Sequence, residues 1–174
     1  IVAVKVAAAG QHVYVADGSG GLHVVDVSDP AAPAEVGALY ADSPAPINVI
    51  GLALIDHYAC LADSLGGLRV VDISDPATPV EVGFYAMPTW VSNVTADGHY
   101  AYALHNQSLQ VMDVSTPAAP VAVGDYRNPG WANHVAVANH YAYVASRETL
   151  NVVDIADPAA PAQVGYYDPP REIQ

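Results

Sequence analysis

A phrase of sixteen residues occurs four times in this chain and constrains its fold more than any other feature. The copies read LHVVDVSDPAAPAEVG (22–37), LRVVDISDPATPVEVG (68–83), LQVMDVSTPAAPVAVG (109–124) and LNVVDIADPAAPAQVG (150–165). Their aspartates, Asp26, Asp72, Asp113 and Asp154, are spaced by 46, 41 and 41 residues. A period of this length is typical of propellers and other arrays in which each unit packs against its neighbours.

The composition indicates a folded protein that does not bind nucleic acid. Apolar residues make up 52% of the 174 residues and charged residues 13%, which is too apolar for a disordered chain. The formal charge of −13 repels phosphate and anionic headgroups, so we expect neither nucleic acid nor a membrane as partner. The longest apolar runs are strand-sized, and membrane insertion is not expected. Because the chain starts at Ile1, we expect a leader or an upstream segment to have been removed.

Each unit contains four short runs rich in Val, Ile, Leu and Tyr, which predict four β-strands. In the second unit these runs are 48–55, 58–62, 68–73 and 80–85. In the first unit they are 2–6, 12–16, 22–27 and 34–40, and they recur within 91–126 and 132–167. Gly-rich segments after the second run predict hairpins, and Ser-Asp-Pro after the third run ends that strand. The later prolines, such as Pro33 and Pro79, suit an outer edge strand.

The recurring aspartates admit two interpretations. Regularly spaced carboxylates can ring a cation, but each of these four closes a β-branched run just before a turn. There the carboxylate can accept backbone N–H groups and hold the bend, so we expect a structural role and no metal. Zinc spacing, a phosphate loop and a nucleophile motif are absent from the sequence, so we expect no cofactor. Cys60 lies in an apolar run, where a buried, unreactive thiol is expected.

The third-run strands are apolar on both faces, which is typical of a sheet packed between other sheets. We therefore predict an all-β fold, a β-propeller with four four-stranded blades; a β-solenoid is the rival, but its repeats are usually shorter. The predicted blades are 1–41, 47–86, 90–126 and 131–167, within one propeller domain and followed by a tail, 168–174.

The repeated phrase resembles the LVIVD repeat, a family of bacterial and archaeal propeller repeats. Leu22-His23-Val24-Val25-Asp26 and its three copies match the five residues that give the family its name, and the resemblance covers nearly the whole chain. It implies a propeller, on surface or secreted proteins without an agreed chemistry. The third and fourth units depart from the pattern: His105 and Ser146 stand where the others have Asp17 and Asp63, and the Gly-Gly pair is lost. We expect different rim loops there.

Four units without a spare strand leave the closure of the ring open. An open arc would expose two apolar blade faces. Further sequence could complete a seven- or eight-bladed ring, two chains could associate as a homo-oligomer, or the four blades could close alone. Because the resemblance implies large rings, we expect a partial ring or one completed by oligomerisation.

Candidate ligand-binding residues lie where the copies differ, at the start of the innermost runs. Alignment of the units pairs Trp90 with Trp131 and Asn93 with His134, next to Asn133, and Arg127 is expected near the same rim. Such aromatic, amide and imidazole groups could bind a sugar or a small polar ligand. Alternatively, the tryptophans cover the ends of the blade interfaces, and Asn93 and His134 cap turns.

The sequence thus favours a non-enzymatic propeller module, a scaffold or binding domain for protein or carbohydrate in a secreted, cell-surface or periplasmic protein. The alternative is a hydrolase or lyase with its site at the mouth of the central channel, and a third possibility is a structural piece of a larger surface protein. No catalytic residue is assigned.

Overall fold

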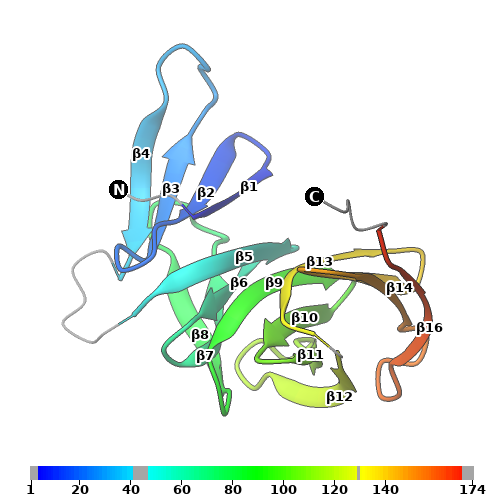
Figure 1. Cartoon of the computed structure of the whole chain (residues 1–174). Coiled ribbons are helices and arrows are strands. Elements are labelled where there is room, and N and C mark those ends of the chain that lie inside the picture. Colours follow the sequence, from blue (N-terminus) through cyan, green and yellow to red (C-terminus); the bar gives the residue numbers. More distant parts are fainter. Residues whose placement is uncertain (1–3, 41–46, 129, 170–174) are drawn as a thin grey trace.

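The computed structural model describes residues 4–40, 47–128 and 130–169, which form sixteen strands in four separate four-stranded antiparallel sheets. Within each sheet the strands follow one another in chain order, so each sheet is one blade (Figure 1). No helix in this part of the chain could cross a membrane. Residues 41–46, between the first two predicted blades, and most of the predicted tail, 170–174, lie outside the described residues.

Blade 1 consists of β1 (Lys5–Ala9), β2 (His12–Ala16), β3 (Leu22–Asp26) and β4 (Ala34–Leu39). Blade 2 consists of β5 (Val49–Ile55), β6 (Tyr58–Asp63), β7 (Gly67–Asp72) and β8 (Val80–Ala86). Blade 3 consists of β9 (Val91–Asp97), β10 (Tyr100–His105), β11 (Ser108–Asp113) and β12 (Val121–Arg127). Blade 4 consists of β13 (Ala132–Ala138), β14 (Tyr141–Ser146), β15 (Leu150–Asp154) and β16 (Ala162–Tyr167).

The first strand differs from its predicted position. Residues 2–6 were expected in β1, but β1 runs from Lys5 to Ala9. A two-residue hairpin loop sets this position, because Gly10 has φ 58° and His12 pairs directly with Ala9. The alanines 7–9 form the strand through this hairpin, although alanine has little β-propensity of its own.

The turn between the third and fourth strands has the same construction in all four blades. The recurring aspartate accepts the backbone N–H of the residue two positions later, at N···O distances of 2.7–2.9 Å, in Asp26, Asp72, Asp113 and Asp154. For Asp26, Asp72 and Asp113, hydrogen bonds from the following serine lower the pKa of the carboxyl. The outer strand then begins directly after a proline, as the sequence predicts.

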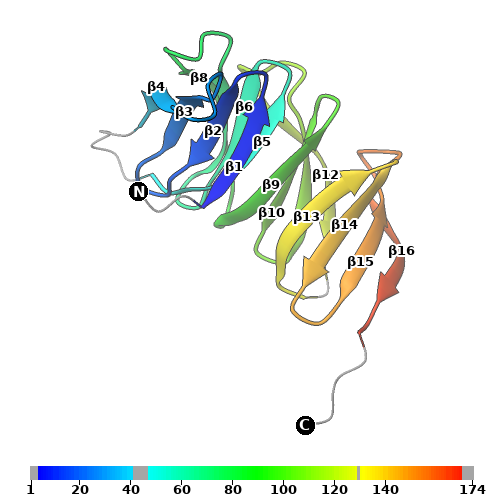
Figure 2. The ribbon, with the colours of Figure 1, turned by 90° about the horizontal axis from the view of Figure 1, so that it is seen from above.

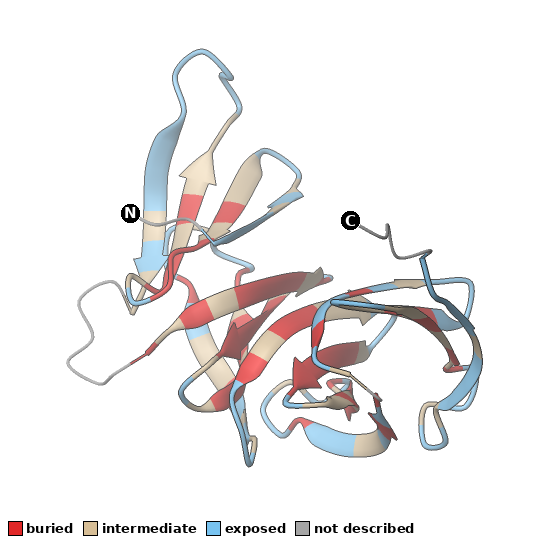
Figure 3. Cartoon of the chain, viewed as in Figure 1, coloured by how far each residue is buried: buried red, intermediate tan, exposed pale blue. Residues whose placement is uncertain are grey.

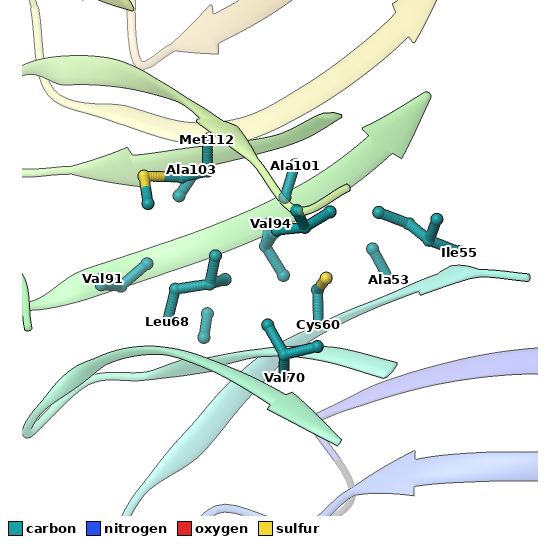
Figure 4. Packing of buried hydrophobic residues seen from close by; sticks show 12 residues of the cluster. Ala53, Ile55, Cys60, Leu68, Val70, Val91, Val94, Ala101, Ala103 and Met112 are labelled. Atoms are coloured by element: carbon teal, nitrogen blue, oxygen red, sulfur yellow. The ribbon is translucent and has the colours of Figure 1, made fainter. Parts of the chain in front are cut away.

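The blades pack face to face through three clusters of buried apolar side chains, one for each pair of neighbouring blades. Between blades 2 and 3, Leu68, Val70 and Cys60 lie against Val94 and Met112 (Figure 4). Burial raises the pKa of the Cys60 thiol to about 12, which keeps it protonated at neutral pH. The core is therefore divided into layers between sheets.

A glycine on each outer strand allows the next blade to approach closely. A Cβ at Gly37, Gly83 or Gly124 would overlap the carbonyl oxygen of Pro76, Pro117 or Pro158, respectively, in the Pro-containing turn of the following blade. We call this glycine the notch and the opposing turn the knob. The same pairing recurs at all three junctions between neighbouring blades.

The four blades form an open arc. Blades 1 and 4 lie at its opposite ends, and the innermost strands β1, β5, β9 and β13 line its concave side (Figures 1 and 2). Exposed residues are concentrated in the two end blades, along β1, β4 and β16 (Figure 3). The fold is thus part of a propeller ring, as expected from the sequence.

Candidate ligand-binding site

Three of the four innermost strands begin with a β-bulge, whereas β1 pairs without a register shift. The ladder register skips one residue near the start of β5, β9 and β13, leaving Ile50, Ser92 and Asn133 without a direct partner on the neighbouring strand. A bulge re-aims the side chain of the extra residue. In blades 3 and 4 that residue is polar, so the bulges place Ser92 and Asn133 at the rim of the concave side, where both line one cavity.

Trp90 and Trp131 immediately precede β9 and β13, at equivalent positions of their blades. Their ring centroids are 6.1 Å apart with an interplanar angle of 77°, an edge-to-face arrangement that aromatic pairs favour. The two residues are nevertheless 56% and 50% exposed. The pair thus presents apolar surface to solvent at the junction of two blades.

A cavity of about 310 Å³ lies beside this pair, lined by Trp90, Ser92, Asn106, Trp131, Ala132, Asn133 and Arg147. A second cavity, of about 320 Å³, is lined by Gly130, Trp131, Ser146, Arg147, Glu148 and Thr149. Because Trp131 and Arg147 line both, the two hollows adjoin. Together they form one candidate site at the inner rim of blades 3 and 4.

The other predicted site residues do not line either cavity. Asn93 is buried, and its Nδ2 donates to the carbonyl oxygen of Asn133 at 3.4 Å, which connects β9 to β13. His134 occupies the equivalent register position on β13 and is exposed. Arg127 is exposed at the end of the outermost strand, opposite Ser108. The structure thus brings together Trp90, Trp131 and Asn133, with Asn93 as a support.

Arg147 was not singled out from the sequence, although a signal for it exists. It lies in the β14–β15 hairpin, where the first two units have a Gly-rich loop and this unit has Ser146, Arg147, Glu148 and Thr149. The backbone N–H groups of Glu148 and Thr149 donate to the hydroxyl oxygen of Ser146, at 3.4 and 3.1 Å. These bonds hold a tight loop that sets Arg147 between the two hollows.

His105, the other departure from the repeat, belongs to a local structural network. The end of β10 places its Nδ1 3.1 Å from the hydroxyl of Thr89 and its Nε2 3.9 Å from the carboxylate of Asp125. The residue is buried, and it is not among those that line the two cavities. It holds the segment before Trp90.

The groups that line the two cavities are of kinds that binding sites use. Aromatic rings, an amide, a hydroxyl and a guanidinium can stack on and hydrogen-bond a polar ligand. Glu148 is the one carboxylate among the described residues that line the two cavities, whereas acid–base cleavage of a glycosidic bond ordinarily uses two. Within residues 4–40, 47–128 and 130–169, no group of three or more His, Cys, Asp or Glu is placed to hold a metal.

Comparison with solved structures identifies the same fold elsewhere. The crystal structure of the computationally designed Ika8 protein superposes with a TM-score of 0.73 at 13% sequence identity. The match covers 94% of this chain and 48% of the Ika8 chain, so this chain spans about half the length of that protein. The comparison with curated proteins gave no match.

Comparison with family models identifies the repeat itself. The LVIVD repeat model matches at residues 2–40, 48–87, 90–128 and 129–169, one match for each blade. The matches extend over nearly the whole sequence, and they coincide with the four sheets. The chain belongs to the LVIVD-repeat family, and its four repeats are four propeller blades.

Proposed function

We propose that this chain is a non-enzymatic binding module whose propeller scaffold presents the cavity beside Trp90 and Trp131 to a carbohydrate. The observation that carries the proposal is the pair of half-exposed tryptophans lining one hollow with Ser92, Asn133 and Arg147. Aromatic faces cover the C–H surfaces of a sugar ring, and the polar groups around them match its hydroxyls. A volume of about 310 Å³ suits a ligand of one or two sugar residues.

The arrangement of the scaffold favours binding over structural capping. A tryptophan that only sealed the end of a blade interface would be buried by it, whereas these two are half exposed. Their supports are rigid, since β9 and β13 are inner strands joined by the contact from Asn93 to Asn133. A preorganised site on such strands loses little conformational entropy when a ligand binds.

A hydrolase or lyase is the alternative function. The cavities would need a second acid or base beside Glu148, and the described lining residues offer Arg147, amides and hydroxyls. Binding without turnover therefore fits these residues better.

We place the module on a secreted or cell-surface protein, consistent with its acidic, lysine-poor composition. Protease treatment of intact cells of the source organism should degrade it, and full protection would contradict this location.

Intrinsic fluorescence offers a direct test, because Trp90 and Trp131 are the two tryptophans of the chain. Titration with cellotetraose, chitotetraose and tri-galacturonate should change the tryptophan emission saturably for at least one of these sugars. The bound sugar should also protect the tryptophan emission from quenching by acrylamide. The absence of a saturable change with all three, and with a wider panel of oligosaccharides, would sink the proposal. Release of reducing sugar during long incubation would instead favour the hydrolase.

Variants assign the binding to this cavity. Calorimetric titration should show Trp131→Ala and Arg147→Ala binding the responsive sugar at least about tenfold more weakly, as expected for anchoring residues of a site. Tyr166→Ala is the matched control, since Tyr166 is an exposed aromatic residue on outer strand β16 and lines neither cavity. Equal loss in the control would place the binding elsewhere.

A further inference from the structure

We infer that the two end faces of the arc are complementary docking surfaces, and that two copies of this chain join head to tail through them into one eight-bladed ring. The face of blade 4 that points away from blade 3 is called the leading face. The face of blade 1 that points away from blade 2 is called the trailing face. In the proposed ring each leading face packs on the trailing face of the other copy.

The notch and knob show what the leading face lacks. Gly37, Gly83 and Gly124 each lie against the Pro turn of the following blade, and a Cβ there would collide with it. At Gly165, the equivalent glycine of blade 4, a Cβ would meet nothing within 4 Å. The notch is present and its knob is missing, so the surface has the shape of the inner junctions.

The trailing face carries the matching unused knob. In blades 2 and 3 the second proline of the turn, Pro79 or Pro120, is buried by the preceding blade. Pro33 in blade 1 has the same place in the repeat and is exposed, as is Pro30, whose counterparts are half-buried. The notch at Gly165 and the knob of blade 1 are both unoccupied. We expect them to fit each other as the notches and knobs of the three inner junctions do.

The apolar side chains of the end faces follow the same pattern. On the trailing face Val6 is 58% exposed, whereas its counterpart Leu52 is 3% exposed. On the leading face Tyr167 is 58% exposed, whereas its counterpart Tyr126 is 9% exposed. The other apolar positions of the two faces are half-buried where their counterparts in the inner junctions are fully buried: Val13, Val15, Val25 and Val27 in blade 1, and Tyr143, Ala145, Leu150 and Val152 in blade 4.

A hydrogen bond can also fix how the two end faces align with each other. At the junction of blades 3 and 4 the Tyr126 hydroxyl donates to Oε1 of Gln163 at 2.9 Å. Tyr167 corresponds to Tyr126, and Glu35 corresponds to Gln163, so the same bond can form from Tyr167 of one copy to Glu35 of the other. Because its acceptor is a carboxylate, this bond should be stronger than the bond from Tyr126 to Gln163 within the chain.

A second copy is the occupant that best fits the size of the arc. The chain covers 48% of the designed protein on which it superposes, so two arcs supply the extent of that chain. A ring of two has closed symmetry, uses both end faces of both copies and leaves no apolar face in solvent. Further copies would add to form an open-ended assembly only if the rotation from one copy to the next did not close the ring after two copies.

Native mass spectrometry and light scattering of the 174-residue chain test the inference. The expected particle is a dimer of twice the 18.1 kDa chain mass, without larger species. A monomer at tens of micromolar would overturn the inference and leave the end faces to another polypeptide. Open-ended oligomers would overturn the ring of two.

One substitution separates docking from folding. Gly165→Leu has open space in the single chain and φ outside the left-handed region, so it should leave the circular dichroism and unfolding of the monomer unchanged while blocking the notch. We expect it to shift the dimer to monomer by at least 100-fold in dissociation constant. Tyr166→Leu, on the adjacent residue whose side chain faces the other way, is the control and should remain dimeric. A Gly165→Leu protein that dimerises as tightly as the native chain would refute this interface.

Discussion

The repeated aspartates act at the scale of the single residue, by holding the turn that ends each third strand. In blade 2 the Asp72 carboxylate accepts the Ser74 backbone N–H at 2.8 Å. Hydrogen bonds from Ser74, first its side chain and then its backbone, lower the pKa of Asp72 from its ordinary value of 3.8. Since the folded chain binds the Asp72 proton less tightly than the unfolded chain, this stabilisation is complete above pH 3.8 and is lost as the pH falls through the folded pKa.

Asp72→Ala should therefore lower the free energy of unfolding by about 1 kcal/mol at pH 7. The difference from the native chain should shrink when the pH falls below about 4, because the native carboxyl then becomes protonated too. Urea unfolding at pH 7 and pH 3 measures both values. Asp72→Asn, which keeps an oxygen acceptor, should be milder at pH 7, and a difference independent of pH would contradict the account.

At the scale of the element, blade 2 is tied together by one arginine across three strands. Arg69 on β7 donates from Nε to Asp63 at the end of β6, at 2.9 Å, and from Nη1 to Glu81 on β8, also at 2.9 Å. Its guanidinium lies over the rings of Tyr40 and Phe84, at 5.4 and 4.9 Å from their centroids. Asp63 is fully buried, so its charge depends on this partner and on nearby backbone N–H groups.

Arg69→Met should destabilise the chain by about 3 kcal/mol, because it leaves the Asp63 carboxylate buried without its cation. Adding Asp63→Asn should recover a large part of the loss, since the buried charge is then removed. A urea unfolding series on the native chain, the two single variants and the double variant measures this coupling. Strictly additive effects would show that the pair is not the cause.

At the scale of the whole molecule, the core lies between blades, and Cys60 reports on its integrity. The thiol is buried between blades 2 and 3, and burial raises its pKa to about 12, so almost no thiolate exists at neutral pH. As the one cysteine of the chain, it should react with a disulfide reagent only when those blades separate. Its reaction rate should rise with urea in parallel with unfolding, and Cys60→Ala gives the background signal. Rapid labelling of the native chain would contradict the packing at this junction.

The sequence predicts the repeated architecture well and the contacts between repeats poorly. The four strands per unit, the aspartate-closed turn and the outer strand after proline follow from local chemistry at Asp72 and Pro79. The start of β1 was missed because a two-residue hairpin, and not β-propensity, sets it. The need for a glycine at Gly83 cannot be predicted from one unit, because the group that excludes a Cβ there is a backbone carbonyl of the next blade.

The sequence likewise predicts some residues of the candidate site and misses others. Alignment of the copies pairs Trp90 with Trp131, and the strand register gives the same equivalence. It could not separate Asn133, which a bulge turns to the cavity, from His134, the next residue, which lines neither hollow. Arg147 was marked only by the loss of two glycines, because a loop's departure from its repeat shows that it changed and not where its side chain lies.

The glycine notch has a consequence for how such a protein can evolve. Each repeat carries both halves of the junction, a notch on its last strand and a knob on its preceding turn, so neither half depends on the identity of the neighbour. A duplicated gene segment should therefore encode a blade that carries both the notch and the knob its neighbours require. Rim loops such as the one bearing Arg147 can then diverge freely, because the parts that join the blades are inherited with every copy.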